Sequence, residues 1–365
     1  MSKKILFITS EFPPLPGGIG NHAFLLSKNL QINNYLVKII TNHRSKNIEE
    51  ETLFDDDQLF EVIRIKRYKL VFFSYLLRVY NAIKHTEGSE IIIASGKFSL
   101  WTVALAKVLY SKKKTIAVIH GSEVNRGGLL SKKMTFWSLN KMDKIIAVSQ
   151  FTKDIALIDK HHLKIQVIHN GFELKNFDDI EINLQGSPSI ITIGNVSKRK
   201  GQHNFIKAIP NVLNSYPELH YHMVGLPSDK KNLTILAQKL EVSKYITFHG
   251  MVSEKDKYHL LSGSKIFLML SDVINQGEVE GFGIAILEAN SLGIPAIGSK
   301  HSGISEAIKS GFNGILVNPN KIDEIEQAIK LILADYPSFS INALEWSKKF
   351  NWNVVVKKYI KVLES

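Results

Sequence analysis

Short runs of apolar, β-branched residues recur along the chain, and a longer amphipathic segment follows each of them. The runs are KILFIT, LVKIIT, IIIAS, KTIAVIH and KIIAVS, then SIITIG, HYHMVG, ITFHG, KIFLML and PAIGS. Runs that are apolar throughout are typical of parallel strands buried on both faces, with helices as the crossovers between them. The sequence therefore predicts an α/β chain with doubly wound parallel sheets.

This pattern occurs twice, which indicates two domains. The first series ends near KIQVIHNGFELKNF, and the polar stretch DDIEINLQGSPS precedes the strand that restarts it. A chain of 365 residues also exceeds what one hydrophobic core usually supports. We therefore expect two Rossmann-like domains, residues 1–177 and 178–345, which face each other across a cleft. Ligands of open α/β sheets bind beyond the carboxyl ends of the strands, so we expect the site in this cleft.

The composition narrows the classes of function. The chain has no cysteine, which excludes disulfides, thiolate metal sites and cysteine nucleophiles. It has no run of about eighteen apolar residues that could span a bilayer, and MSKKILFITSEFPP lacks the apolar stretch of a signal peptide, so we expect a cytoplasmic protein. The net charge of +12 favours a phosphorylated substrate, anionic lipid or nucleic acid as partner, or reflects a lysine-rich solvated surface. Because the basic residues are scattered and no recognition motif is present, we expect no nucleic acid partner.

A glycine-rich turn, FPPLPGGIG, follows the first predicted strand. Its three prolines can extend neither a strand nor a helix, and Gly17 and Gly18 can adopt backbone angles closed to other residues. The helix that follows offers unpaired amides and a positive dipole end to a phosphate. The alternative is a merely tight turn between strand and helix.

A basic turn, GNVSKRKGQH, has the same position at the start of the second half. Gly194 closes a strand, and Arg199 and Lys200 lie where that strand meets the next helix. Cations at this position are well placed to hold a diphosphate. The alternative is a solvated basic turn, which is the interpretation we favour for Lys198.

The stretch EVEGFGIAILEANSLGIPAIGS combines carboxylates and glycines ahead of an apolar helix. Gly281 and Gly283 indicate a loop, and the helix is predicted to begin near Ile284 with its first amides available to a phosphate or a sugar hydroxyl. The helix is apolar on most sides, so Glu288 is expected to be buried and to need a partner, such as the diol of a ribose. Glu280 could accept hydrogen bonds from further hydroxyls. In the alternative, Glu280 caps the helix and Glu288 is exposed.

These residues resemble a known signature. E-G-F-G-I-x-x-L-E followed by A-x-x-x-G-x-P is similar to the motif of retaining GT-B glycosyltransferases of family 4 (group 1), which include sucrose synthases and bacterial phosphatidylinositol mannosyltransferases. Further segments resemble that family in order over nearly the whole chain: FPPLPGGIG, IHGSE, VIHNGFELKNF, GNVSKRKG, ITFHGMVS and GISEAIKSGFNGILV. The resemblance implies the GT-B fold, with a final helix, residues 346–365, that crosses back onto the first domain.

The resemblance also implies roles for individual residues. Glu288 would bind the nucleotide ribose, and Lys200, with Arg199, would neutralise the diphosphate. Gly17 and Gly18 would approach that diphosphate from the first domain. The remaining donor contacts would come from the sugar-binding His120 and from Glu280, Gly281, Phe282, Gly283 and Ile284. A lone histidine is more often a core residue, but its place in IHGSE favours the functional interpretation.

The same resemblance implies front-face attack with retention, in which the leaving phosphate accepts the proton of the acceptor. No acidic pair stands at a strand end, and Asp55–Asp57 is predicted to be a solvated loop, so we expect neither a metal nor another cofactor. One departure is Asn195, where the family commonly has arginine. Either Arg199 reaches the phosphates instead, or diphosphate binding is weaker.

The acceptor side is indicated by RIKRYKLVFFSYLLRVYNAIK, residues 64–84. On a helix starting near Val71, positions 72, 76, 79, 80 and 83 form an apolar stripe that suits a core-facing helix. The alternative is a surface that rests on anionic lipid, at the inner face of the membrane. Its cations would be Arg64, Lys66, Arg67, Lys69 and Arg78.

The expected function is therefore transfer of a hexose from a GDP- or UDP-linked donor to a glycan or lipid-linked acceptor. The implied pathway is synthesis of a bacterial surface polysaccharide such as lipopolysaccharide or capsule. The alternative is another nucleotide-sugar enzyme, such as an epimerase.

Overall fold

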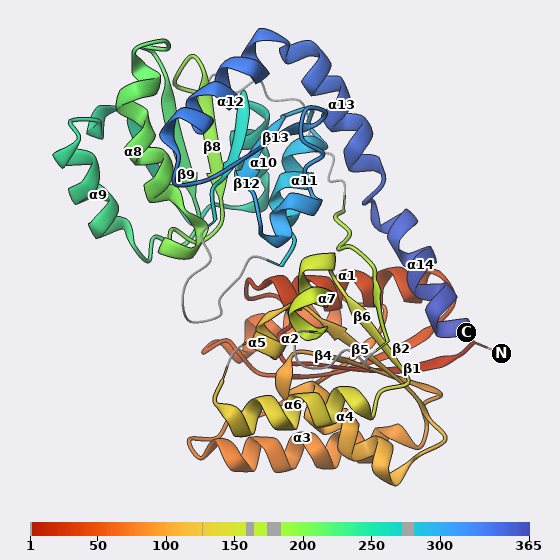
Figure 1. The fold of residues 1–365 in the computed structure, drawn as a ribbon. Helices are drawn as coiled ribbons and strands as arrows, with labels where there is room; N and C mark the ends of the chain where they lie inside the picture. The colour runs from red at the N-terminus through yellow and green to blue at the C-terminus, as the bar shows by residue number, and fades with distance from the viewer. Residues whose placement is uncertain (1, 126, 158–163, 174–183, 272–280) are drawn as a thin grey trace. The chain divides into compact units, whose positions relative to one another are not determined.

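The computed structural model describes residues 2–125, 127–157, 164–173, 184–271 and 281–365. It divides the chain into two compact units (Figure 1). Unit 1 consists of Met1–Gly171 and Trp352–Ser365, and unit 2 consists of Phe172–Asn351. The predicted boundary at residue 177 lies outside the described residues.

Unit 1 is built on a seven-stranded parallel sheet of order β3-β2-β1-β4-β5-β6-β7. The strands are β1 (Lys4–Thr9), β2 (Leu36–Asn42), β3 (Glu61–Ile65), β4 (Ile91–Ser95), β5 (Lys114–Ile119), β6 (Lys144–Ala147) and β7 (Ile165–Val167). The strand order reverses direction between β1 and β4, where Ile5 pairs with Ile91. This reversal creates a switch point, the place at which open α/β sheets bind ligands.

Helices cover both faces of this sheet. They are α1 (Gly18–Ile32), α2 (Ile48–Asp56), α3 (Val71–Thr86), α4 (Lys97–Leu109), α5 (Ser122–Asn125), α6 (Leu129–Asn140), α7 (Gln150–Leu157) and α14 (Trp352–Glu364). Because strand side chains alternate between faces, Ile5 and Phe7 pack with α1 and α14, whereas Leu6 and Ile8 pack with α4.

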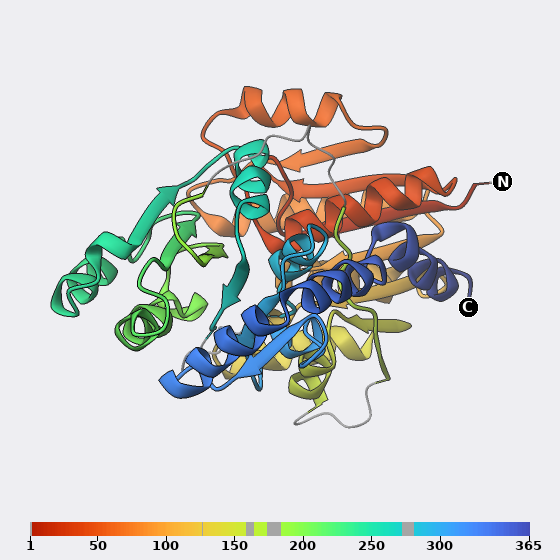
Figure 2. The same ribbon diagram turned by 90° about the horizontal axis from the view of Figure 1, so that it is seen from above.

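The C-terminal helix α14 belongs to unit 1 although the preceding 180 residues form unit 2. It lies beside α1 (Figures 1 and 2), and Val355, Val356 and Tyr359 on it are buried. Trp352 packs so closely on Gly171 that a Cβ at that glycine would lie 2.8 Å from the indole. The returning segment begins at Trp352 rather than at the predicted residue 346, because Trp346 packs in the core of unit 2.

Unit 2 repeats the architecture with six parallel strands in the order β10-β9-β8-β11-β12-β13. The strands are β8 (Ser189–Ile193), β9 (His220–Val224), β10 (Ile246–Gly250), β11 (Ile266–Met269), β12 (Ala296–Ser299) and β13 (Gly314–Val317). The helices are α8 (Gln202–Leu213), α9 (Lys230–Lys239), α10 (Glu254–Ser262), α11 (Ile284–Asn290), α12 (Ile322–Ala334) and α13 (Tyr336–Lys348), with 3-10 turns η1 (Lys198–Lys200), η2 (Ser243–Tyr245) and η3 (Gly303–Glu306). The switch point of this sheet lies between β8 and β11.

All ten predicted runs contain strands, and both sheets are parallel and doubly wound, so the predicted fold class is confirmed. The ten runs did not include β3, β7 or β13. All three are edge strands, and each has side chains that are only partly buried. Their sequences, EVIRI, IQV and GILV, lack the long apolar run of a central strand.

Candidate functional site

The two predicted phosphate-binding turns each follow the first strand of a sheet, at its switch point. In unit 1 the glycine-rich turn runs from the end of β1 to α1, and Ser10 donates its amide to the Ser95 carbonyl at the end of β4, 3.1 Å away. In unit 2 the basic turn runs from the end of β8 to α8. Each sheet therefore presents its predicted ligand-binding turn at the edge where ligands of this architecture bind.

Gly17 and Gly18 differ in the space around them. A side chain on Gly17 would collide with the Glu11 carboxylate and lie 3.4 Å from Nη1 of Arg44. Gly18, the first residue of α1, has no atom within 4 Å of the position of a Cβ. The backbone at Gly18 is thus open to a ligand. Position 17 requires a glycine because its neighbours leave no room for a side chain.

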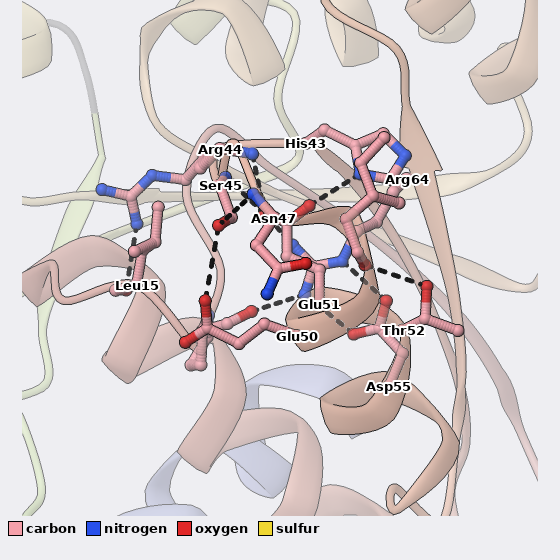
Figure 3. Close-up of polar contacts among 12 residues, drawn as sticks. Leu15, His43, Arg44, Ser45, Asn47, Glu50, Glu51, Thr52, Asp55 and Arg64 are labelled. Carbon is pink, nitrogen blue, oxygen red and sulfur yellow. Dashed lines mark hydrogen bonds and ion pairs between the residues drawn. The ribbon is translucent and has the colours of Figure 1, made fainter.

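Two arginines hold the carbonyls of the same turn, and Figure 3 shows the contact between Arg44 and Leu15. Arg44 donates to the carbonyls of Leu15 and Pro16, at 3.1 and 3.0 Å, and Arg64 donates to the Pro13 carbonyl. Asp55 lies in α2 and forms a bidentate ion pair with Arg64, with N–O distances of 2.6 and 2.8 Å. The prediction that Asp55 is part of a solvated loop is therefore wrong.

His120 lies directly after β5, at the same sheet edge. Its Nε2 is 3.1 Å from Oγ of Ser95, and its backbone amide donates to Oε2 of Glu123 at 3.0 Å. Burial lowers the pKa of His120 to about 4, so the ring is neutral at neutral pH. It can exchange hydrogen bonds with a ligand hydroxyl, but it does not offer a positive charge.

Two residues behind His120 were not predicted. Glu123 is buried and ties the IHGSE turn to the strand end; its place three residues after the histidine was the available signal. His22 packs edge-on against the His120 ring, at 5.0 Å between centroids, and its Nε2 lies 3.0 Å from the Tyr359 hydroxyl on α14. Burial, and then the neighbouring His120, lower the pKa of His22 well below its usual value.

In unit 2 Lys200 folds back over the end of β8. A Cβ on Gly194 would lie 3.0 Å from Cε and 3.3 Å from Nζ of Lys200. Gly194, at φ 140°, therefore leaves room for the ammonium group at the switch point. Gly225 directly follows the neighbouring strand β9, and Gly250 ends β10. Both glycines have positive φ, and Gly225 donates its amide to the Gly250 carbonyl at 2.8 Å. A glycine, which has no side chain, thus stands at the carboxyl end of each of three adjacent strands.

Asn195 exposes its side chain and uses its backbone to hold the turn. Its carbonyl accepts from Nε2 of Gln202 at 3.1 Å, and Oε1 of Gln202 accepts the Ser197 amide at 3.3 Å. Gln202 is buried and was not predicted. Arg199 lies in η1 beside Lys200, and both are partly exposed.

The loop ahead of α11 is described from Gly281 onward, and Glu280 lies outside the described residues. Gly283 has φ 85° and caps α11, which begins at Ile284 as predicted. Because α11 follows β11 in a parallel sheet, its first turn lies at the carboxyl edge. The Phe282 side chain points away from solvent and packs against Phe350, at 5.5 Å between centroids, so only its backbone can face a ligand.

Glu288 is mostly buried, as expected, and has a protein partner. Its Oε1 lies 3.2 Å from Nζ of Lys257 on α10, which also contacts Glu254 at 3.1 Å. Burial alone would lower the pKa of Lys257, but the two carboxylates outweigh it and raise that pKa above its usual value. Oε2 of Glu288 makes no hydrogen bond to the described part of the chain. Nothing in the segment EKDKYHLL signalled the role of Lys257.

The helix of the predicted acceptor side, α3, has the opposite orientation to the one predicted. Phe72, Leu76 and Tyr80 of the apolar stripe are exposed, whereas Arg78 on the other side is only 2% exposed. Arg64 is buried as well. The core-facing interpretation of the stripe is therefore wrong, and neither arginine can contact lipid. Of the predicted lipid-binding cations, Lys66, Arg67 and Lys69 are exposed.

Two kinds of feature are absent from the described residues. No helix within residues 2–125, 127–157, 164–173, 184–271 and 281–365 is long and apolar enough to cross a membrane. Within the same ranges, no group of three or more histidine, aspartate or glutamate side chains is arranged to hold a metal ion.

The chain is similar to glycosyltransferases over almost its whole length. It is 23% identical to the GDP-mannose-dependent monoacylated alpha-(1-6)-phosphatidylinositol monomannoside mannosyltransferase of Corynebacterium glutamicum, covering 100% of this chain and 98% of the relative. It is 26% identical to the putative colanic acid biosynthesis glycosyltransferase WcaL of Salmonella typhimurium, covering 50% of this chain and 44% of that one.

Solved structures show the same fold. Anabaena HepE, crystallised with UDP and glucose, superposes with a TM-score of 0.81 at 19% identity, covering 99% of both chains. This likeness and the two parallel sheets confirm the predicted GT-B fold. The model of "Glycosyltransferase Family 4" matches residues 16–176, and that of "Glycosyl transferases group 1" matches residues 175–348. The chain belongs to the group 1 glycosyltransferases of family 4.

Proposed function

We propose that this glycosyltransferase moves a hexose from a GDP- or UDP-linked donor to a glycan or lipid-linked acceptor, with retention and without a metal. The observation that carries the proposal is the Lys200 ammonium at the switch point of unit 2, over the side-chain-free end of β8. A cation at that point suits a diphosphate. The pathway we propose is bacterial surface polysaccharide synthesis, such as lipopolysaccharide or capsule, which the likeness to WcaL supports.

The proposed chemistry needs charge stabilisation more than a nucleophile. The bond between the anomeric carbon and the diphosphate oxygen breaks, and a bond to the acceptor oxygen forms on the same face. The acceptor proton passes to the leaving phosphate. Lys200, Arg199 and the backbone amides from Gly283 onward stabilise the developing negative charge, which is the role a metal would otherwise have. His120, neutral at physiological pH, orients the donor sugar through hydrogen bonds.

Glu288 is the proposed ribose ligand. Lys257 holds one oxygen of its carboxylate, which leaves Oε2 to accept from a diol. The relative that uses GDP-mannose supports a GDP-linked donor, and the structural neighbour crystallised with UDP supports a UDP-linked one. Both nucleotides therefore enter the test.

The first experiment is a thermal-shift panel of UDP, GDP, ADP and their common sugar conjugates, with and without EDTA, on wild type and Glu288→Ala. We expect a base-selective rise in melting temperature that EDTA does not change and that the variant loses. The selected donor is then assayed for transfer, and the anomeric configuration of the product is read by NMR. Absence of any shift, or a shift that EDTA abolishes, contradicts the proposed donor site.

We also propose that α3 rests on an anionic membrane at its cytoplasmic face. Phe72 and Tyr80 are 65% and 62% exposed, and Tyr68, Phe73, Leu76, Leu77 and Tyr80 line an apolar groove. Three exposed cations precede the helix, and no carboxylate occurs between Glu61 and Glu87. A second copy of this face would oppose like charges, whereas an anionic bilayer complements both the charge and the apolar side chains.

The test is flotation with phosphatidylcholine vesicles, with and without phosphatidylglycerol. We expect wild type to float with the anionic vesicles, less so at high salt, and Leu76→Glu to remain unbound. Leu109→Glu on α4 is the matched control, because Leu109 is an exposed leucine of the same unit outside α3. No flotation in any condition, or equal loss in both variants, contradicts the proposed contact.

A further inference from the structure

We infer that Glu51, Arg64 and Arg44 form a clamp that positions the glycine-rich turn, residues 13–18, for the donor. Glu51 and Arg64 act through the turn and are positioning residues. The inference rests on the proposed function, in which Gly18 approaches the diphosphate of the donor.

The turn needs external hydrogen-bond donors because of its own sequence. Three of the residues in PPLPG are prolines, which have no amide hydrogen and cannot form the internal hydrogen bonds of an ordinary turn. Their carbonyls still require partners. Arg64 supplies one at Pro13, and the fork of Arg44 supplies two at Leu15 and Pro16, at 3.1 and 3.0 Å. The turn is therefore held by side chains from β3 and from the segment after β2.

Glu51 joins the two arginines (Figure 3). Its Oε1 accepts the amides of Arg44 and Ser45 at 2.7 and 2.9 Å, and it forms an ion pair with Nη1 of Arg64 at 3.1 Å. Its Oε2 lies 2.6 Å from Nδ1 of His43. One carboxylate thus fixes the backbone that carries Arg44 and the side chain of Arg64. The bidentate pair between Arg64 and Asp55 supplies a second anchor on the same helix.

The burial of Glu51 and Arg64 shows that they position the turn and do not contact the donor themselves. The side chains of Glu51 and Arg64 are 1% and 4% exposed, so neither can touch a donor molecule. Burial would raise the pKa of Glu51, but the hydrogen bonds from Arg44, Ser45 and His43 outweigh it and lower that pKa below its usual range. The carboxylate is therefore charged at neutral pH. Any effect of these two residues on donor use must travel through the turn.

Gly17 lies between Arg44 of the clamp and Gly18, the residue at the open end of the turn. The position of a Cβ at Gly17 lies against the Glu11 carboxylate and 3.4 Å from Nη1 of Arg44, whereas the space beside Gly18 is open. A shift of about 1 Å in a group that positions substrate can lower a rate a hundred-fold. Loosening the clamp therefore weakens donor use without removing any atom that the donor contacts.

The test compares donor and acceptor kinetics in Glu51→Gln, Arg64→Lys and Arg44→Lys. The glutamine keeps the size of Glu51 but removes its charge, and lysine keeps the charge of arginine but loses the fork that holds two acceptors. The matched control is Lys38→Ala, which removes the cation of an ion pair with Glu61, 2.8 Å apart, between β2 and β3. Arg44 is only partly buried, so Arg44→Lys keeps the test valid if Glu51→Gln does not fold.

We expect Glu51→Gln to raise the KM for the donor and to lower kcat/KM about ten- to a hundred-fold, with the KM for the acceptor unchanged. Amides of peptide 12–20 should exchange hydrogen faster in the three variants and at the wild-type rate in Lys38→Ala. A merely structural role would lower the active fraction, and so kcat, while both KM values stayed constant. That outcome, or unchanged exchange in peptide 12–20, overturns the inference.

The two proposals fail in different ways. An active wild type with unaffected variants refutes the clamp and leaves the proposed function standing. A wild type inactive with every donor refutes the proposed function and with it the kinetic part of the clamp, while the exchange of peptide 12–20 still decides whether the three residues hold the turn.

Discussion

Replacing Gly201 by alanine tests whether the basic turn of unit 2 is held in place by its close packing against the end of β11. Gly201 has φ 73°, and an alanine there costs about 1–2 kcal/mol from the backbone angle alone. Its Cβ would also lie 3.1 Å from the Ser271 amide nitrogen and collide with the Leu270 carbonyl, both just beyond β11. Because backbone atoms cannot rotate away, overpacking adds about 1–3 kcal/mol or moves the turn. We expect a total loss of about 2–5 kcal/mol.

Gly311→Ala is the matched control. Gly311 has φ 78°, but no atom lies within 4 Å of its Cβ position. It precedes β13 and so lies at the amino ends of the strands, whereas Gly201 lies at their carboxyl ends. This variant should therefore lose only the backbone cost of about 1–2 kcal/mol. The difference between the two variants isolates the collision with the end of β11.

The assay is native-state hydrogen exchange of α8, the helix that Gly201 caps, together with donor-nucleotide affinity. Local exchange suits a chain of two units, whose unfolding need not be two-state. A difference of 1.4 kcal/mol changes exchange about tenfold. The collision cost of about 1–3 kcal/mol should therefore make α8 exchange about five- to 140-fold faster in Gly201→Ala than in Gly311→Ala. Nucleotide affinity should fall only in Gly201→Ala, because Lys200 moves with the turn. Equal exchange and equal affinity in both variants would refute the reasoning.

Three further predictions concern the two sites. Lys200→Ala should abolish most transfer, whereas Asn195→Ala should have a mild effect because the exposed Asn195 side chain holds no part of the turn; comparable losses in a transfer assay refute this assignment. Tyr359→Phe removes the partner of the buried His22 and should cost about 1–3 kcal/mol of local stability in native-state hydrogen exchange of α1 and α14. This cost should exceed that of Tyr35→Phe, whose partner Glu364 is exposed; an equal cost contradicts the prediction. Burial lowers the pKa of His120 to about 4, so as the pH falls the unfolded chain protonates this histidine before the folded chain does. The free energy of unfolding should therefore fall as the pH drops from 6.5 towards 4. Melting curves of wild type and His120→Gln at several pH values check this, since the melting temperature of the variant should decline less.

Part of the site could be predicted from the sequence because its motifs are local. Glycines and cations that directly follow a strand occupy a known place in a parallel sheet, so the residue types and their spacing were enough to place Gly18 and Lys200 in turns at the switch points and to predict the start of α11. Their partners come from elsewhere in the chain. Lys257 reaches Glu288 from another helix, and Tyr359 reaches His22 across 337 residues. No local pattern encodes such a pairing.

The orientation of α3 and the burial of Arg64 show the same limit. The periodicity of residues 72–83 describes an apolar stripe correctly, but a stripe does not say whether core or solvent lies beside it. The sequence around Arg64 is typical of a surface cation, whereas in the fold Asp55 and Glu51 lie against it.

Residues that are close together in the chain specify the two parallel sheets, the order of their elements and the turns at their switch points, because strand and helix periodicity and glycine positions act over a few residues. The burial of individual charges, the helix face that meets solvent and the link from a carboxylate on α2 to the turn between β1 and α1 follow only from the folded structure. Those properties depend on contacts between segments that lie far apart in the chain, and burial, not residue type, sets the strength of such contacts.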